Sequence, residues 1–457
     1  MVYNMLNKIL YRVLIIISCA AVLLSCEQDT FMGLEIEHSG SISQKQEIKR
    51  DYNQEERNVL LLYSAGYNSI SGFLTDDIND LMKGDLPSSG RMEDVLLVYS
   101  HHLSSKGGYN VPESPVLMRV YKDMADRPLM DTLVVYPSSV HSATASQLND
   151  VLMYVKENYP ARSYGMIFSS HATGYLPSGY YTNPANYVYT PSGGQRSFGQ
   201  DSAFKESQGV PYVEPEYDPI FPMVKSVGQD MIGTYGNYTS YEIQIEDFAR
   251  ALPMYMDYIL FDACLMGGVE VAYELAGKCG KVGFSQTEVL AEGFDYKTLT
   301  SHLLYGGIPD PVAVCKDYYH QYDVQSGIYR SATISMVDCS KMEPLAEVCA
   351  SLFDKYREAI SRLKPSVVQR YYRNNYHWFY DLVDIIAQAG ATDTELAELN
   401  RAVDDCVLYK ARTPEFMKEF IIRSYSGFSM YLPCNGSAEL DKYYRTLKWN
   451  IATGLVE

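Results

Sequence analysis

The chain has 457 residues, and 47% of them are hydrophobic, which is enough for a sizeable core in one large domain or in two. Its net charge of −18 argues against the basic surface that proteins use to bind nucleic acid. An acidic surface suits an exported protein and mildly favours cationic substrates, although solubility alone also explains it.

The N-terminus has the pattern of a bacterial signal peptide. Lys8 and Arg12 precede an apolar run that continues to Leu24 and is short for a membrane span. A serine and Cys26 follow this run, which resembles the lipobox of bacterial lipoproteins and makes Cys26 the expected lipidation site. A plain secretory signal is the alternative.

These features predict a processed, lipid-anchored protein. Residues 1–25 form the predicted lipoprotein signal peptide. Residues 26–56 are polar, lack clear periodicity and form the predicted flexible tether. The expected location is the bacterial cell envelope, in the outer membrane or at the surface, with the lipid as the contact to the membrane.

Apolar strands alternate with helix-like segments over residues 57–340, the predicted core. Strands are expected at residues 59–63, 94–99, 117–121, 133–136, 166–168, 258–261, 282–285 and 328–337. Helices are expected after the first strand, in the segment that runs to residue 155 and in the segment that runs to residue 275. Near-continuous apolar strands of this kind predict an α/β fold with a mostly parallel sheet between layers of helices.

Two regions depart from this alternation. Residues 172–240 are rich in Tyr, Gly, Pro and Ser, show almost no apolar periodicity, and form a predicted long insertion between core strands. Residues 341–457 form a predicted, mainly helical C-terminal region. Its helices are expected at residues 341–363, 366–389 and 395–411, and a late strand is expected at residues 428–432.

Two strands end directly before reactive side chains. His171 lies just past the strand at 166–168, and Cys264 lies just past the strand at 258–261. Parallel strands end at one sheet edge, so a thiol and a base can face each other there if the strands are neighbours. Histidine can activate the thiol and protonate a leaving amine. A helix expected after Cys264 would favour the thiolate through its dipole. The backbone N–H groups of Ala172 and Cys264 are the candidate donors to an oxyanion.

Each of these residues also has a simpler interpretation. A lone cysteine after a strand is usually part of the core, and a lone histidine in a loop is usually solvated. His101 and His102 also follow a strand and are rival bases. The cysteines beyond the signal region lie at 264, 279, 315, 339, 349, 406 and 434. They have no zinc-binding spacing, so no metal site is predicted, and at least one thiol of this odd number stays unpaired within the chain.

The strand-end motifs resemble those of the caspase-like cysteine peptidases. Residues 262–267 read Asp-Ala-Cys-Leu-Met-Gly, which resembles the clostripain family in particular. Further agreement comes from residues 285–288, 292–296 and 427–433. The resemblance spans residues 57–435 and implies a caspase-like fold and an endopeptidase that cleaves after Arg, with Lys as a further option.

The resemblance also implies roles for individual residues. His171 corresponds to the base and Cys264 to the nucleophile of the family. Asp262 and Glu292 correspond to the acids that recognise the basic residue before the scissile bond, although the family more often has Asp at the second position. A carboxylate pair suits a guanidinium or ammonium group. As alternatives, Asp262 can cap the following helix and Glu292 can be a surface acid.

Three departures from the family pattern stand out. Ala172 replaces the usual Gly, and its methyl group can crowd the oxyanion site. Residues 289–291 read Val-Leu-Ala where Pro-Gly often occurs, and the insertion after His171 is long. Self-cleavage occurs in the family, and Arg196 and Lys205 are the candidate sites here, with an uncut specificity loop as the alternative.

These departures leave two other functions open. One is a catalytically decayed, surface-tethered binding protein on a caspase-like scaffold, and the other is a peptidase of altered specificity. The sequence requires no cofactor, while calcium is used by some members of the resembling family. The expected partners are protein or peptide substrates with Arg or Lys and the membrane, but no nucleic acid.

Overall fold

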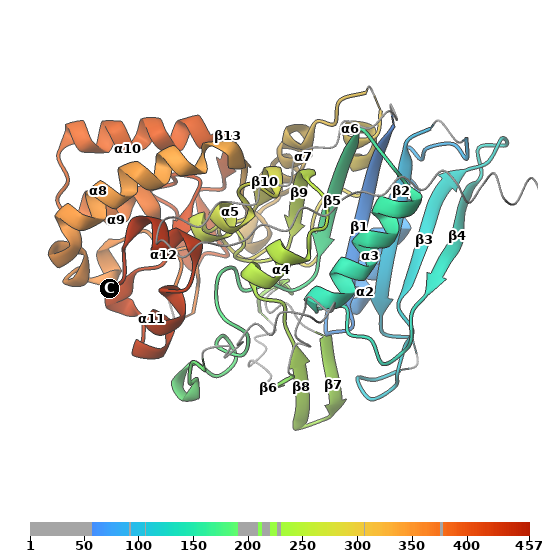
Figure 1. Ribbon diagram of the computed structural model, residues 1–457, viewed down its shortest axis with the longest axis horizontal. Helices are drawn as coiled ribbons and strands as arrows, with labels where there is room; N and C mark the ends of the chain where they lie inside the picture. Colours follow the sequence, from blue (N-terminus) through green and yellow to red (C-terminus); the bar gives the residue numbers. More distant parts are fainter. Residues whose placement is uncertain are drawn as a thin grey trace, which may run out of the picture. The chain divides into compact units, whose positions relative to one another are not determined.

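The computed structural model of the chain describes residues 57–90, 93–105, 107–190, 209–212, 220–225, 230–305, 307–374 and 378–457. All of them belong to one compact unit that spans residues 46–457 (Figure 1). The predicted signal peptide, the tether, Cys26, Arg196 and Lys205 lie outside the described residues. Within the described ranges, no helix combines the length and apolar character that a membrane crossing requires.

The central feature is a nine-stranded sheet with the order β13-β11-β10-β9-β5-β1-β2-β3-β4. Its strands are β1 (Asn58–Gly66), β2 (Val95–His102), β3 (Val116–Lys122), β4 (Pro128–Val135), β5 (Ser163–Ser169), β9 (Met256–Asp262), β10 (Cys279–Phe284), β11 (Thr333–Asp338) and β13 (Val407–Arg412). The strands from β10 to β2 are parallel, and antiparallel strands extend both edges. The predicted mostly parallel sheet is therefore confirmed.

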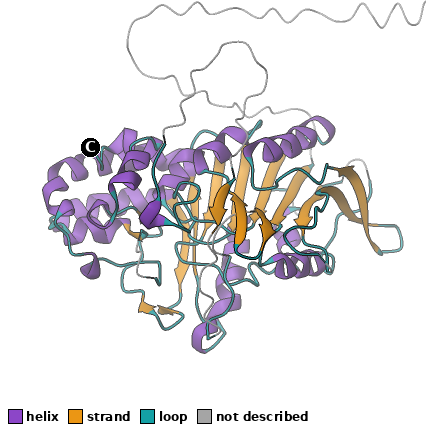
Figure 2. Cartoon of the chain, turned by 90° about the horizontal axis from the view of Figure 1, so that it is seen from below, coloured by secondary structure: helices purple, strands orange, loops and turns teal. Residues whose placement is uncertain are grey.

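Helices cover both faces of this sheet (Figure 2). One face carries α2 (Ser71–Leu81), α6 (Leu299–Leu303) and α7 (Pro311–Asp323). The other face carries α3 (Ala145–Asn158), α4 (Ile245–Ala251) and α5 (Val269–Leu275). From β1 to β2 the chain adds a strand toward one edge of the sheet, and from β5 through β9 to β10 it adds strands toward the opposite edge. Right-handed connections therefore put α2 on one face and α4 and α5 on the opposite face.

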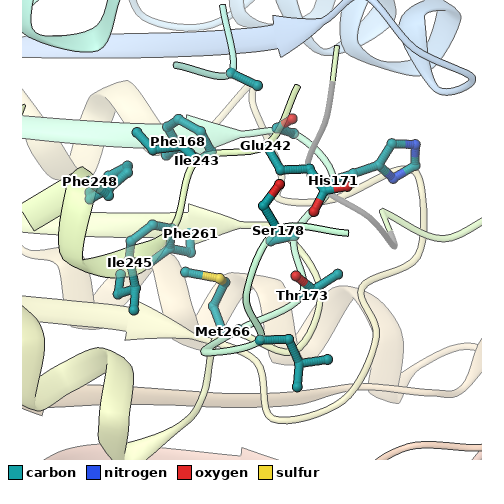
Figure 3. A pocket seen from close by; sticks show the side chains of 15 residues that line it. Phe168, His171, Thr173, Ser178, Glu242, Ile243, Ile245, Phe248, Phe261 and Met266 are labelled. Carbon is teal, nitrogen blue, oxygen red and sulfur yellow. The ribbon is translucent and has the colours of Figure 1, made fainter. Parts of the chain in front are cut away.

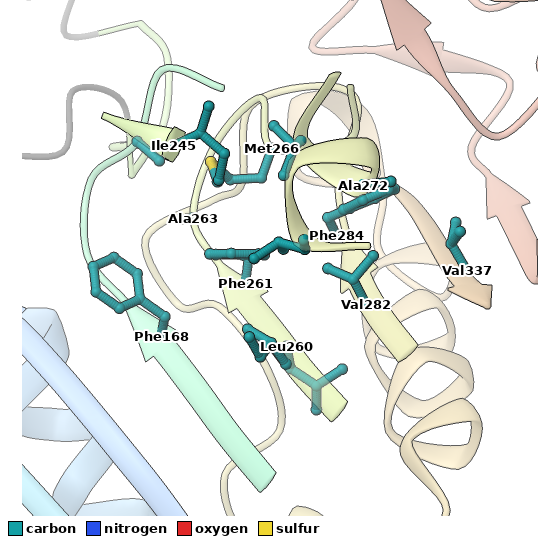
Figure 4. Packing of buried hydrophobic residues seen from close by; sticks show 14 of the residues in the cluster. Phe168, Ile245, Leu260, Phe261, Ala263, Met266, Ala272, Val282, Phe284 and Val337 are labelled. Atoms are coloured by element: carbon teal, nitrogen blue, oxygen red, sulfur yellow. The ribbon is translucent and has the colours of Figure 1, made fainter. Parts of the chain in front are cut away.

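Aromatic side chains fill the layer between the sheet and helix α4. Phe168 of β5 and Phe261 of β9 lie on this side (Figure 4). Both rings pack against Phe248 of α4. Side chains alternate between the faces of a strand, so the next residues, Ser169 and Asp262, point to the opposite side, which α2 covers. The apolar core thus fixes the direction of two polar side chains at the sheet edge.

The C-terminal region is mainly helical, as predicted, and also completes the sheet. Its helices are α8 (Met342–Ser361), α9 (Leu382–Gln388), α10 (Asp393–Cys406), α11 (Ala438–Tyr444) and α12 (Lys448–Thr453). The helix expected at 395–411 ends at Cys406, and the following residues form the edge strand β13. The prediction was wrong there because pairing with β11 overrides helical periodicity in this alternating segment.

The helix expected at 366–389 is also shorter than predicted. Its described first part is irregular, and α9 follows β12 (Tyr380–Asp381), which pairs with the predicted late strand β16 (Ser429–Met430). A second small hairpin joins β14 (Glu415–Phe416) to β15 (Phe420–Ile421). Single 3-10 turns are η1 (Pro184–Asn186), η2 (Gly327–Tyr329), η3 (Cys339–Lys341), η4 (Pro365–Val367) and η5 (Pro433–Asn435).

The insertion has more structure than its composition indicated. Its described parts include β6 (Val210–Tyr212), β7 (Asp230–Thr234) and β8 (Asn237–Tyr241), which form a sheet in the order β6-β8-β7. These strands are short and polar, so their alternation is weak in the sequence. Between β6 and β7, residues 220–225 run back to the edge of the main sheet.

Candidate active site

The register of two neighbouring strands brings the predicted base and nucleophile to one place. Strands β5 and β9 are parallel neighbours, and Ser169 at the end of β5 pairs with Asp262 at the end of β9. His171 and Cys264 each follow two residues later. The condition for an imidazole beside a thiol, that the two strands are adjacent, is therefore met.

Cys264 is fully buried in a tight turn after β9. The backbone N–H of Val289 lies 3.0 Å from its sulfur and donates to it. Leu265, the next residue, has a left-handed backbone with a φ of 61°. Helix α5 begins only at Val269, so the expected dipole at a helix N-terminus does not lie directly against the thiol. The N–H of Val289 supplies a positive dipole at the sulfur instead, and the thiol also lies 3.6 Å from the Val289 carbonyl oxygen.

His171 is buried beside the loop that follows β1. Its Nε2 lies 3.1 Å from Oγ of Ser69. Burial is the main cause that lowers the pKa of His171 to about 3. A hydrogen bond with the Lys225 backbone opposes this shift, and the nearby ammonium group of Lys225 adds to it. The imidazole is therefore neutral, which is the form that can accept a proton from a thiol.

The rival bases lie elsewhere. His101 and His102 are at the end of β2, and β1 and β5 separate that strand from β9. His102 contacts Ser64 Oγ at 2.8 Å, and His101 contacts Ser142 Oγ at 3.1 Å, so both imidazoles belong to local polar contacts. The sheet order favours His171 as the partner of Cys264.

The lowered pKa of His171 predicts acid sensitivity of the fold. Between the unfolded pKa of about 6.5 and the folded pKa of about 3, the unfolded chain binds the extra proton. The free energy of unfolding should fall as the pH drops through this window, by up to about 1.4 kcal/mol per pH unit from this group. Thermal melting of wild type and His171→Asn between pH 7 and pH 4 measures this. A wild-type curve parallel to that of the variant would contradict the prediction.

The two predicted oxyanion donors point at the same atom. The N–H groups of Ala172 and Cys264 both donate to the carbonyl oxygen of Lys225, at 3.1 Å and 3.3 Å. The methyl group of Ala172 leaves its own N–H accessible to this oxygen. Two backbone donors that converge on one carbonyl are the arrangement that stabilises the oxyanion of acyl transfer.

The segment that carries this carbonyl is bound like an extended peptide. Val224 forms an antiparallel bridge with Leu290. The N–H of Lys225 donates to the Val289 carbonyl, and the N–H of Ala291 donates to the Met223 carbonyl, both at 2.9 Å. Main-chain pairing of this kind holds a peptide in register without regard to most of its side chains.

The side chain of Lys225 is completely buried between two acids. Its Nζ forms an ion pair with Asp262 and lies 3.2 Å from Asp77 Oδ2 and 3.2 Å from Ser169 Oγ. Burial raises the pKa of Asp77 to about 8, against the effect of the ammonium group. Burial also opposes the charge of Lys225, but the two carboxylates outweigh it and raise the lysine pKa. The lysine is therefore held in its charged form.

Comparison with known proteins shows the family of the chain. Residues 62–190 and 216–453 match the sequence model of the clostripain family. The chain belongs to the clostripain family. It is accordingly a cysteine peptidase with a caspase-like fold, as the motifs implied. This family membership supports a peptidase rather than a binding protein without catalytic activity.

Two solved structures share the fold of this clostripain-family chain. An inactive zymogen of a C11 protease from Parabacteroides distasonis is 25% identical, with a TM-score of 0.66 over 88% of this chain and 99% of that chain. A secreted C11 cysteine protease from Bacteroides thetaiotaomicron, in complex with an irreversible peptide inhibitor, is 21% identical, with a TM-score of 0.63 over 88% and 99%. The comparison with curated proteins found no match.

The second acid predicted for this clostripain-family site is not in the pocket. Glu292 is exposed, and the acids that contact Lys225 Nζ are Asp262 and Asp77. The next residue, Gly293, has a left-handed backbone with a φ of 60° and lies against Asp262, where the Glu292 side chain was expected. Asp262 is not a helix cap either, since Gly268 is the N-cap of α5.

Three residues of the candidate site were not predicted from the sequence. Asp77 has a weak signal, because it lies on the buried face of α2 with Leu74 and Ile78, where an acid is unusual. Lys225 is one basic residue among several in the insertion, and nothing in the sequence ranks it first. Ser69 is a loop serine that only its contact with His171 reveals.

A small cavity lies behind the histidine rather than in front of it. Its volume is about 30 Å³, room for about one water molecule, and the imidazole of His171 points away from it (Figure 3). Phe168, Phe248 and Phe261 line its apolar part, and Glu242 lies at its polar part. The cavity is thus distinct from the place where residues 223–225 pair with residues 289–291.

The described residues hold no group of three or more His, Cys, Asp or Glu side chains that suits a metal ion. No calcium ligands are therefore assigned among them. All seven cysteines beyond the signal region are described, and none of these forms a disulfide. Six of them are buried, as expected for small hydrophobic residues.

Proposed function

We propose that this protein is an exported, lipid-anchored cysteine endopeptidase that cleaves after basic residues through a Cys264–His171 dyad. The observation that carries the proposal is Lys225, because its ammonium group lies between buried carboxylates while its carbonyl oxygen accepts from two backbone donors. One residue thus meets both requirements of a peptide bound for cleavage, recognition of its side chain and polarisation of its carbonyl.

The proposed reaction uses a covalent intermediate. The Cys264 sulfur attacks the carbonyl carbon of the basic residue and forms a carbon–sulfur bond, while the thiol proton passes to His171. The N–H groups of Ala172 and Cys264 stabilise the oxyanion. The carbon–nitrogen bond then breaks, and His171 gives its proton to the departing amine. Water, deprotonated by His171, hydrolyses the thioester and releases a new carboxylate and the thiol.

The same reaction is proposed to cut the chain itself after Lys225. This bond replaces Arg196 and Lys205 as the proposed self-cleavage site, because Lys225 is the basic residue beside the dyad and the oxyanion donors. Cleavage would produce a new N-terminus at Ser226. Until then, the segment of residues 223–225 occupies the position that a substrate needs, so the uncut enzyme is expected to be inactive toward other peptides.

A peptide acyloxymethyl ketone that ends in Lys or Arg tests the proposed function. Mass spectrometry should find the adduct on Cys264 in the cut protein, with much less in the uncut protein. A matched reagent that ends in Glu should not react when it is used at the same concentration as the basic reagents. A folded, cut protein that gains no adduct from either basic reagent would refute the proposal.

Export and anchoring are proposed from the N-terminal pattern. One of the structurally similar proteins is described as secreted, which agrees with this expectation for an exported chain. The proposed location is the bacterial envelope, with Cys26 lipidated, the membrane as partner and no role in nucleic-acid binding. Cys26→Ala should move the protein from the membrane fraction to the soluble fraction. Equal membrane retention of both proteins would exclude the lipid anchor at this residue.

A further inference from the structure

One acid at the floor of the pocket around Lys225 Nζ lies outside the sequence motifs that resemble the clostripain family. Asp77 comes from helix α2, far in sequence from the strands that carry Ser169 and Asp262. It is buried, and its Oδ2 lies 3.2 Å from Lys225 Nζ. Because β9 directs Asp262 to the side of the sheet that α2 covers, the two carboxylates meet below the same ammonium group.

The number of oxygens matches the number of protons on the ammonium group. An ammonium ion donates three hydrogen bonds, and Nζ of Lys225 has three oxygen partners, on Asp262, Asp77 and Ser169. Ser169 in turn donates to Asp262 Oδ2 at 3.1 Å, and Tyr296 donates to the same oxygen at 2.6 Å. These hydroxyl groups fix the position of the Asp262 carboxylate.

The pocket is also closed around the end of the lysine side chain. Lys225 has no exposed surface. A methyl group added to Gly293 would lie 2.6 Å from Nζ, so the backbone of this glycine forms a close wall. In an arginine, the guanidinium carbon would stand near the position of Nζ, and two nitrogens would extend about 1.3 Å further into the surrounding oxygens. The planar guanidinium also needs acceptors arranged in its plane rather than around a point.

We infer that Asp77 is a specificity-determining residue, and that the pocket it forms with Asp262 and Ser169 selects lysine over arginine. This inference rests on the proposed function and narrows its substrate class to peptides with lysine before the scissile bond. Asp77 on helix α2 thus takes the role of second pocket acid, which the family pattern gave to Glu292.

Asp77→Asn is the appropriate variant, since it keeps the size of the side chain. Asp262 remains in the variant as the charged partner of the ammonium group, so Asp77→Asn leaves a balanced ion pair and is expected to fold. The adjacent Asp76 is exposed on the same helix, and Asp76→Asn is the matched control with the same change in charge. Melting curves and the rate of Cys264 alkylation by iodoacetamide check that the site stays intact.

Matched fluorogenic peptides that end in Lys, Arg or Met provide the first measurement, on the self-cleaved protein. The wild type should prefer Lys over Arg by roughly tenfold or more in kcat/KM. Asp77→Asn should lower kcat/KM for the Lys peptide by roughly 10-fold to 100-fold, and Asp76→Asn should leave it unchanged. Equal wild-type rates for Lys and Arg would overturn the selectivity. An unchanged Lys rate in Asp77→Asn would overturn the role of Asp77.

A second measurement needs no turnover. In uncut Cys264→Ala protein, Lys225→Arg should lower the melting temperature if the pocket fits lysine better, and an equal or higher value would overturn the inference. If the wild type cleaves no basic peptide although Cys264 is alkylated, the proposed function fails. The melting comparison then decides by itself whether the pocket prefers lysine.

Discussion

Replacing the proposed nucleophile, Cys264→Ala, is expected to abolish both peptide hydrolysis and cleavage after Lys225. The thiol supplies the atom that bonds to the substrate carbonyl, and His171 and the two N–H donors have no substitute nucleophile to activate. The rate should fall by a factor on the order of 10⁴ or more. Peptide turnover and the appearance of a fragment that begins at Ser226 measure the two losses.

A second cysteine variant controls for general thiol effects. Cys434 is half-buried and its sulfur contacts the Leu363 carbonyl at 3.3 Å, so Cys434→Ala changes a thiol outside the site. This variant should self-cleave and hydrolyse peptides like the wild type. Cleavage after Lys225 in purified Cys264→Ala protein would show that another enzyme, rather than the chain itself, cuts this bond.

Replacing the inserted lysine, Lys225→Met, is expected to prevent cleavage at this position and to destabilise the uncut protein. The variant keeps the carbonyl and much of the apolar side chain but removes the ammonium group between Asp77 and Asp262. Buried acids left without their partner cost about 3–5 kcal/mol of stability, unless the segment leaves the pocket and admits water. Either outcome should lower the melting temperature or raise the alkylation rate of Cys264.

The comparison is made in backgrounds that stay uncut, Cys264→Ala for melting and His171→Asn for alkylation, because the wild type is proposed to cut itself. Lys83→Met, which changes an exposed lysine of a surface ion pair, is the matched control and should have little effect. Adding Asp77→Asn to Lys225→Met should restore part of the stability, because one of the two unpaired acids is removed. Normal cleavage at residue 225 in Lys225→Met, or unchanged melting together with unchanged alkylation, would contradict the role given to this lysine.

Much of the fold was predictable because its determinants are local. Apolar runs such as residues 59–63 and 258–261 are strands, and their alternation with helices indicates a parallel sheet without knowledge of any contact. The errors occurred where long-range pairing prevails. Residues 407–411 have a pattern compatible with a helix, yet they pair with β11 at the sheet edge.

The site was predictable to the same extent. His171 and Cys264 could be found because each follows an apolar strand, and parallel strands end at a common edge. The donors at Ala172 and Cys264 are backbone groups of the same two turns, so they came with the motif. Glu292 was assigned to the pocket from its position in a family pattern, but its side chain is exposed and Gly293 lies against Asp262 instead.

The sequence by itself determined the α/β architecture and the strand-end positions of His171, Cys264 and Asp262, since each depends on residues close together in the chain. Only the tertiary structure decided which lysine occupies the pocket and which second acid binds it. Lys225 is 37 residues from Asp262 and 148 from Asp77, and no local pattern encodes contacts over such separations. They exist because the packing of α2 and the return of the insertion bring three charges to one buried point.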